Sequence, residues 1–555
     1  MARESKIILC KNIKMDRDYL NVLSYNESDM LTLVNSTGIK VVEKTDYSFI
    51  GKSDRSAITV DVDYSTCLGC NYMAFQNKNY NNKWYFAFID KVEYLNDGAT
   101  RLYYTVDIFS TWLDYWSDKE CFVVREHVND DTVGLHTIPE GLELGEYICS
   151  DKVDLYSGGN TTYIAIASTW LPSEFNLNQH TTQYGGIYSG SVILLFDSPL
   201  GASKFIDIMD AKAKKDAIVA IFLVPQAFLG TATFNTVTVD TRTTYCAVPE
   251  YTSTFNVLAS GISVSRPTTI DGYTPVNKKL LVYPYQYFFI TNNAGADISY
   301  HYEDFVTGAS PTFDTIGTLT PGCSIKCIPL NYKKLSDSSS YKSYDYGLTA
   351  AKYPVCSWST DVYTNWLTEN GINIAIDYAV SGAAIVGGAA LIATGVGVAG
   401  GVSMIGAGAA GIAGELKQQY EHSLTPPQSR GNTNSGDIGY SSGAMTIPAY
   451  KMSIRAEYAR CIDDYFSKLG YKVNRLKYAN QVGRATWNYV QIGSGEVIGY
   501  QKTDVLAIPP EDLVNINKLY QRGITLWHNH STLGDYTQSN NIVNSTPTPT
   551  PTPIS

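Results

Sequence analysis

One stretch of this sequence carries no charge, and it limits what the chain can fold into. From Tyr378 to Gly414 there is no Asp, Glu, Lys or Arg, and about 30% of the positions are Gly and about as many are Ala. As one straight helix these residues would reach roughly 55 Å, well beyond a hydrocarbon core of about 30 Å. Two passes of about 18 residues would fit a bilayer as a hairpin.

Large apolar side chains are spaced among the small ones in this stretch. They are Ile385, Val386, Leu391, Ile392, Val396, Val398, Val402, Met404, Ile405 and Ile412. Each Gly costs a helix about 1 kcal/mol relative to Ala, so the glycines together oppose a rigid helix by about 10 kcal/mol in water. Gly397 and Gly401 form a G-x-x-x-G pattern, which permits close helix contact in lipid.

Three interpretations of the stretch are open. It could be a buried helix pair in the core, a permanent membrane anchor, or a loop that meets a membrane only when it is released. We favour the released loop, because the composition is flexible and apolar and nothing else in the chain has the pattern of a membrane protein.

Two short motifs match enzyme signatures. Gly395, Gly397 and Gly400 fit the dinucleotide pattern G-x-G-x-x-G, and the next acidic residue is Glu415. We attribute the match to chance, because the whole tract is rich in glycine. Gly439 to Gly443 fits G-x-S-x-G with Ser441 as the nucleophile, but no apolar strand pattern precedes it. A serine hydrolase is therefore the weaker alternative.

Histidine and cysteine pairs are the candidates for a metal site. His528 and His530 stand two apart in "WHNHS", and Cys67–Cys70 and Cys323–Cys327 are close pairs. Structural zinc needs four ligands, and no third or fourth ligand can be assigned to any of these pairs. We expect a surface loop at the histidines and buried free thiols at the cysteines, with no catalytic, cofactor-binding or metal residues.

Composition outside the charge-free stretch favours strands. The chain has 42 Tyr and many Thr, Gly and Asn residues, which suit strands and tight turns. Alternating residues from Trp84 to Leu95, the turn at Asn96–Gly98 and a second alternating run predict a hairpin. Three further runs, "SVILLF", "AIVAIFLV" and "LLVYPYQYFFI", also predict strands. The fold class is therefore mainly β with a few helices, an α+β protein.

Helices are expected at a few places only. Residues 454–469 place Ile462, Tyr465 and Phe466 on one stripe, with Gly470 as the stop. A second helix follows Pro510 and ends at Gly523. A third is expected on the surface within "GASKFIDIMDAKA".

The net charge of −11 argues against a general nucleic-acid binder, because phosphate affinity depends on clusters of Lys and Arg. Contact with DNA is still possible. A wall that DNA must slide past should not grip phosphates.

Both ends of the chain resemble a known family. "CNYMAFQNKNYNNKWYFAFIDKVEYLND", "YTVDIFSTWLDYW" and "VVREHVNDDTVGLHTIPEGLELGEYI" resemble the N-terminal part of the tail knob proteins of phi29-like podophages. "YFSKLGYKVNRLKYANQVGRATWNYV" and "YQRGITLWHNHSTLGDY" resemble their C-terminal part. The resemblance covers about residues 5–150 and 450–537.

The resemblance implies a ring-shaped homohexamer at the distal end of a short tail, in which both chain ends form β-barrel-like tube domains. The corresponding segments are an N-terminal tube-forming β domain (1–155), a β-rich middle (156–360), the hydrophobic plug or membrane-active loop with a polar linker (361–450), the C-terminal part of the tube domain (451–540) and a disordered Thr/Pro tail (541–555). In the family the loop plugs the tube and later attacks the host membrane.

The expected function is therefore structural and not enzymatic. The hexamer would conduct DNA, and its loops would plug the tube and then form a pore in the host cytoplasmic membrane for genome ejection. Expected partners are other copies of the chain, upper tail or collar proteins, membrane lipids, and double-stranded DNA passing without sequence-specific binding. The protein would be made in the host cytoplasm and reside in the virion. The alternative is a tail tube or plug without membrane activity.

Overall fold

The computed structural model describes residues 5–543 except 48–49, 52–55, 79–81, 158–161, 176–182, 185–186, 189–190, 230–231, 250–255, 294, 318–323, 334–345, 353–354, 358–445, 494–495, 497 and 502–507. The expected class, mainly β with a few helices, is confirmed for these residues. The chain divides into two compact units, which are described separately. Unit 1 comprises Met1–Leu144, Tyr273–Leu280 and Ala456–Ser555, and unit 2 comprises Gly145–Gly272 and Leu281–Arg455.

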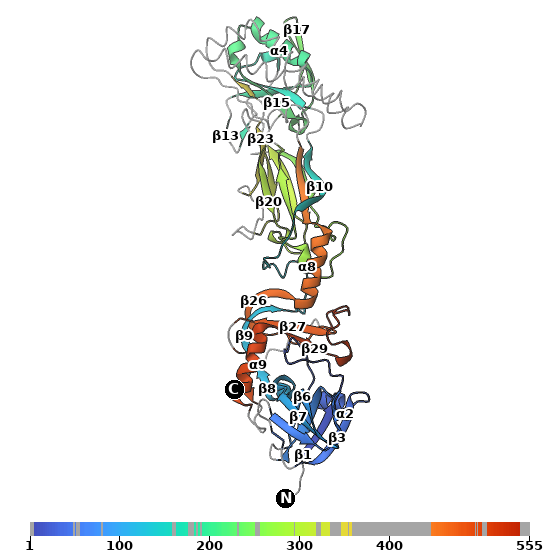
Figure 1. Cartoon of the computed structure of the whole chain (residues 1–555). Helices are drawn as coiled ribbons and strands as arrows, with labels where there is room; N and C mark the ends of the chain where they lie inside the picture. The colour runs from blue at the N-terminus through green and yellow to red at the C-terminus, as the bar shows by residue number, and fades with distance from the viewer. Residues whose placement is uncertain are drawn as a thin grey trace, which may run out of the picture. The chain divides into compact units, whose positions relative to one another are not determined.

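The first sheet of unit 1 comes entirely from the N-terminal part of the chain, drawn in blue in Figure 1. Its strands are β1 (Ser5–Cys10), β3 (Lys40–Tyr47), β4 (Ser56–Val60), β5 (Tyr72–Gln76), β6 (Trp84–Asn96) and β7 (Ala99–Val106), in the spatial order β3-β1-β5-β6-β7-β4. The predicted hairpin is confirmed as β6–β7. Asn96 pairs with Ala99, and Gly98 has a φ of +86°, which glycine adopts without steric cost.

Both faces of this sheet are buried at its central strands β1 and β5. Leu9 and Phe75 pack into one apolar core, whereas Ile8 and Tyr72 pack into another. Successive residues of a strand point to opposite faces, so a sheet covered on both sides needs nearly continuous apolar strands.

The two edge strands of this sheet approach each other at one end. Lys44 Nζ, on β3, lies 3.6 Å from a carboxylate oxygen of Asp61, which directly follows β4. The backbone N–H of Asp61 also donates to the hydroxyl of Tyr47 at 3.4 Å. The sheet therefore curls until its opposite edges meet at this corner.

A second sheet of unit 1 combines the two ends of the chain. Its strands are β2 (Asn21–Leu23), β9 (Glu120–Glu126), β26 (Tyr471–Tyr478), β27 (Trp487–Ile492) and β29 (Ile524–Trp527), in the order β2-β29-β27-β9-β26. Figure 1 shows the pale blue β9 beside the orange β26. A small ladder joins β8 (Trp116–Asp118) to β28 (Ile498–Gln501).

The described helices of unit 1 are α1 (Glu27–Val34), α2 (Tyr64–Cys67), α3 (Ile108–Trp112), α8 (Ala456–Leu469) and α9 (Pro510–Arg522). Two of them, α1 and α3, begin at side-chain caps, Asn26 and Asp107. The two helices predicted near the C-terminal end are confirmed as α8 and α9. Gly470 has a φ of +65°, and a Cβ at this position would lie 2.1 Å from the backbone oxygen of Glu126. Only glycine adopts this positive φ without steric cost and also leaves room for the backbone of Glu126.

The described part of unit 2 holds three four-stranded sheets. The first consists of β10 (Tyr147–Ser157), β25 (Thr446–Ile454), β19 (Gln286–Thr291) and β20 (Asp297–Tyr300). The second consists of β14 (Val192–Phe196), β11 (Thr162–Ser168), β15 (Ile218–Pro225) and β24 (Val355–Ser357). The third consists of β18 (Asn256–Ser263), β21 (Thr312–Gly317), β22 (Ser324–Pro329) and β23 (Leu348–Lys352). Two short hairpins are β12 (Gln183–Tyr184) with β13 (Ile187–Tyr188), and β16 (Asn235–Val239) with β17 (Arg242–Cys246).

One expectation for unit 2 needs correction. The predicted surface helix is present as α4 (Pro199–Ala211), which buries Phe205, Ile208 and Met209 and exposes Lys204 and Asp210. The run "LLVYPYQYFFI" is a strand only from Gln286, because Leu280 and Leu281 belong to a 3-10 turn. An apolar run by itself does not separate a strand from another buried segment.

Candidate functional site

The apolar residues predicted to be membrane-active lie outside the described residues. This holds for all ten side chains from Ile385 to Ile412, and also for Ser441. Among the helices that the structure describes, none is long and apolar enough to cross a membrane. The roles assigned to these residues therefore stay predictions.

The two histidines of "WHNHS" make hydrogen bonds to different partners. His528 Nε2 lies 3.0 Å from Asn488 Oδ1, and the backbone N–H of His530 donates to the hydroxyl of Tyr25 at 3.2 Å. Burial lowers the pKa of both imidazoles. Within the described ranges, no three His, Cys, Asp or Glu side chains are grouped so that they could hold a metal ion.

The cysteine prediction can be examined at three of its four positions. Cys67, Cys70 and Cys327 are buried free thiols, as expected, and Cys323 lies outside the described residues. Burial raises the pKa of Cys70 to about 11 and that of Cys327 to about 12, so both stay protonated at neutral pH.

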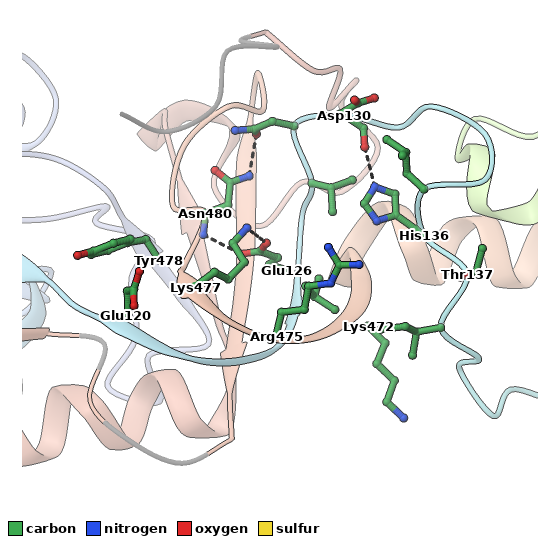
Figure 2. A pocket seen from close by; sticks show the side chains of 15 residues that line it. Glu120, Glu126, Asp130, His136, Thr137, Lys472, Arg475, Lys477, Tyr478 and Asn480 are labelled. Carbon is green, nitrogen blue, oxygen red and sulfur yellow. Dashed lines mark hydrogen bonds and ion pairs between the residues drawn. The ribbon is translucent and has the colours of Figure 1, made fainter. Parts of the chain in front are cut away.

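A cavity of about 410 Å³ opens beside β9 and β26 in unit 1 (Figure 2). A loop after β9 supplies His136 and Thr137, and β26 supplies Lys472, Arg475 and Lys477. The structure thus brings together two segments that lie more than 300 residues apart in the chain. Nothing in the local sequence around either segment marks this cavity.

The cavity is lined by an ion pair of which only the carboxylate is buried, because the Lys477 side chain is 39% exposed. Glu126, whose side chain is 1% exposed, contacts Lys477 Nζ and accepts a hydrogen bond from the backbone N–H of Asn480 at 2.7 Å. Burial raises the pKa of Glu126, and Lys477 and Asn480 oppose that rise. Figure 2 shows Lys477 and Glu126 joined in this way.

One wall of the cavity is held by His136. Its Nε2 bonds to the backbone oxygen of Asp130 at 2.7 Å, and its ring packs 5.3 Å from that of Tyr471. Burial lowers the pKa of His136, which favours a neutral imidazole at pH 7. Arg475 is exposed, and its guanidinium has no hydrogen-bond or ion-pair partner among the described residues (Figure 2).

Three carboxylates behind the cavity hold the segment Tyr273–Leu280, which we call the strap. Glu140 contacts both Arg125 and Lys279, and its side chain is fully buried. Asp131 accepts from the backbone N–H of Lys278 at 2.8 Å. We call Glu140, Asp131 and Asp463 the carboxylate clasp.

Asp463 on α8 makes the densest set of contacts with the strap. It accepts from the hydroxyl of Tyr273 and the backbone N–H of Val276, each at 2.7 Å. Both the backbone N–H and the amide of Asn277 also donate to it. Carboxylates that accept several hydrogen bonds can be buried without being left unsatisfied.

The charges in the lining of the cavity are partly paired and partly free. Its lining residues include neither serine nor cysteine, and its buried charges are already paired. Among the Lys and Arg side chains that line the cavity, Arg475 is the exposed one without a hydrogen-bond or ion-pair partner among the described residues. Paired charges of this kind specify which segments meet, and they are poor nucleophiles or bases.

Two family models match the chain. The model for "Bacillus phage phi29, Tail knob protein gp9, C-terminal domain" matches residues 250–541, and the model for "Caudoviral major tail protein N-terminus" matches residues 3–117. The tail knob protein gp9 of Bacillus phage B103 is 24% identical, over 96% of this chain and 97% of that protein. The tail knob protein gp9 of Bacillus phage phi29 is 22% identical, over 97% of this chain and 98% of that protein.

One solved structure is similar along the whole chain. The tail knob protein gp12 of bacteriophage C1 has a TM-score of 0.58 and 13% sequence identity, and the match covers 97% of this chain and 100% of that chain. At this identity the likeness shows the fold alone.

Proposed function

We propose a mechanism from the premise that this chain belongs to the tail knob protein family of phi29-like phages and is a structural protein of a phage tail. In this mechanism the protein forms a homohexameric ring at the distal end of a short tail. Its bore conducts the genome, and the charge-free tract Tyr378–Gly414 first plugs the bore and then enters the host cytoplasmic membrane.

The make-up of unit 1 supports a tube-forming role. Both chain ends contribute to one compact unit, and the first sheet curls until Tyr47 and Asp61 meet across its opposite edges. A curled sheet hides its edges, which suits a β-barrel-like wall element in a ring of repeated subunits.

The single observation that carries the membrane step is the charge-free tract itself. Its ten large apolar side chains gain roughly 1.5–3 kcal/mol each on leaving water, or about 15–30 kcal/mol for each copy as an upper bound. This exceeds the cost of about 10 kcal/mol that the glycines impose on a helix. A surface of this size is not left in water on a soluble particle, so copies bury one another inside the bore until they are released.

Other partners follow from the same role. The upper end of the ring contacts tail or collar proteins, and double-stranded DNA passes through the lumen without sequence-specific binding. The net charge of −11 suits a conduit that does not hold phosphates. The protein is made in the host bacterial cytoplasm and ends in the virion.

There are two alternatives to this mechanism. In the first, the tract plugs the tube and has no membrane activity. A hydrolase at Ser441 is disfavoured because the similar proteins are tail knob proteins, which are structural components.

The decisive experiment deletes Tyr378–Gly414 and joins the ends by a flexible Gly/Ser linker. We expect the variant to remain a six-fold ring by electron microscopy and to lose leakage of dye from liposomes, because the membrane-inserting side chains are gone. A matched control deletes the polar segment 424–443 instead, which should leave leakage intact.

Each result separates the possibilities. Leakage that persists after deletion of the tract contradicts the membrane role of these residues, and a ring without leakage in the unmodified protein favours the plug alone. Absence of a six-fold ring contradicts the tube itself. Turnover of an ester substrate that is lost in Ser441→Ala would favour the hydrolase.

A further inference from the structure

Unit 1 contains a second cavity, of about 450 Å³, which is lined in part by the strap. Helix α8 contributes Asp464 and Ser467, the strap contributes Asn277, and the C-terminal segment contributes Tyr536 and Asn541, among other residues. We propose that this cavity binds a neutral saccharide. The volume lies within the range of about 300–1,000 Å³ that is typical of small-molecule sites.

Two buried nitrogen donors in the lining have no partner. Trp487 Nε1 and Arg484 Nε are both buried without a hydrogen-bond acceptor among the described residues. Trp487 itself is 1% exposed. A buried donor without an acceptor costs about 1–3 kcal/mol, so a ligand that supplies acceptor oxygens recovers that cost.

The rim of the cavity adds both hydrogen-bond donors and hydrogen-bond acceptors. Asp464 is exposed, and its carboxylate has no hydrogen-bond or ion-pair partner among the described residues. The side-chain amide of Asn541 is equally without a partner in that part of the chain. Ser467 Oγ accepts from Asn277 Nδ2 at 2.8 Å, which leaves its own proton free to donate. Sugar hydroxyls both donate and accept, and therefore match such a mixed set.

The partly exposed ring of Tyr536 supplies an apolar surface to the same lining. Trp487 and Tyr536 meet edge to face, with 5.2 Å between their ring centroids. The hydroxyl of Tyr536 is already bonded to Asn21 Oδ1 at 2.9 Å, so its ring is fixed in position. A sugar ring has an apolar C–H face as well as hydroxyls, so it can use rings and polar groups together.

The charges in the lining disfavour an anionic ligand. The lining contains two carboxylates, Asp131 and Asp464, and one cation, Arg484, whose pKa is lowered by burial. Asp131 is occupied by Tyr471 and the strap, but Asp464 faces solvent and would repel a phosphate. The site therefore selects a neutral sugar over DNA or a phosphate-containing polymer, and this inference does not depend on the membrane step.

The test uses the full chain with three probes: tri-N-acetylchitotriose, maltotriose and, as an anionic comparison, glycerol 3-phosphate. Binding is measured by saturation-transfer NMR and by titration calorimetry. We expect at least one of the two saccharides to bind, and Asp464→Ala and Asn541→Ala each to weaken the Kd about tenfold, the effect of losing one good hydrogen bond. Trp487→Phe, which keeps a ring but deletes the N–H donor, should weaken binding similarly.

The control is Glu457→Ala, which removes the same charge from an exposed position of the same helix, away from the cavity. It should leave the Kd unchanged. Asp464 and Asn541 are exposed, so their variants keep the test valid even if Trp487→Phe does not fold. The proposal is overturned if neither saccharide binds at millimolar concentration, if only glycerol 3-phosphate binds, or if the Asp464 and Asn541 variants bind as the unmodified chain does.

Discussion

Both units bury aromatic and charged side chains, but the most deeply buried ion pairs among the described residues lie in unit 1. In unit 1, the clasp residues Glu140 and Asp463 are buried carboxylates that join segments far apart in the chain. In unit 2, Phe288 packs against the rings of Tyr300, Tyr302, Phe305 and Phe313, with centroids 5.0–6.0 Å apart. The ion pair Lys451–Asp151 of unit 2 leaves the Asp151 side chain 56% exposed.

The difference follows from how each unit is assembled. Unit 1 gathers three separate stretches of the chain, whereas two of the three sheets of unit 2 are built mainly from strands close in sequence. Directional hydrogen bonds and charge pairs can specify which distant segments meet, whereas apolar packing depends mainly on volume. Unit 1 should therefore be more sensitive to charge and pH than unit 2.

The largest effect is expected for Glu140→Ala. This change leaves Arg125 and Lys279 buried without their counter-charge, and should lower the free energy of unfolding of unit 1 by about 3–5 kcal/mol. Hydrogen exchange in increasing denaturant would report the loss for unit 1 separately from unit 2. Lys119→Ala is the control: its pair with Glu496, at 2.9 Å, is 44% and 55% exposed and should contribute less than about 1 kcal/mol. Equal effects of both variants would contradict the role given to the clasp.

An intermediate effect is expected from His127 as the pH falls. Its Nδ1 accepts from the backbone N–H of Tyr489 at 2.7 Å, and its Nε2 lies 3.1 Å from the backbone oxygen of Ser467. Burial lowers its pKa to about 3, so the folded chain holds a neutral imidazole where the unfolded chain, with a pKa of about 6.5, binds a proton. Stability is thus fully present above pH 6.5 and lost as the pH falls toward 3.

The size of this loss can be measured between two nearby pH values. Unit 1 should lose about 2 kcal/mol between pH 6.5 and pH 5, as judged from denaturant midpoints. His127→Gln, which keeps an amide able to donate and accept, should flatten that slope. A slope that is unchanged in the variant would assign the pH dependence to other groups.

The smallest effect is expected for Phe288→Leu in unit 2. Leucine keeps the site apolar and loses only part of the ring contacts, so the cost should be about 1–1.5 kcal/mol and should not vary between pH 5 and 7. Thermal unfolding at both pH values measures it. A pH-dependent cost would show that unit 2 also relies on titrating groups, and the contrast between the units would fail.

Local features of the fold were predictable from the sequence. The hairpin β6–β7 and the helices α8 and α9 follow from alternation, periodicity and the stop residues Gly470 and Gly523. The run around Leu280 was wrongly assigned to a strand, because a buried apolar run has the same pattern in a strand and in a turn.

The cavities were not predictable from the sequence. Glu140 stands in a stretch without regular structure, and nothing near it indicates that Arg125 and Lys279 will meet there. Asn277 and Asp463 are 186 residues apart, and their contact depends on how the whole of unit 1 closes. Contacts between polar residues this far apart produce no periodic pattern in the local sequence.

The sequence by itself determined the strand-rich class, the local helices and turns, and the charge-free tract, because each depends on the order of residues within one short window. Only the tertiary structure decided that three carboxylates hold the strap, and that Trp487 and Arg484 line a cavity with unpartnered donors. Burial and hydrogen bonding between distant residues are properties of the closed fold. They arise only when the intervening chain has packed and removed those groups from water.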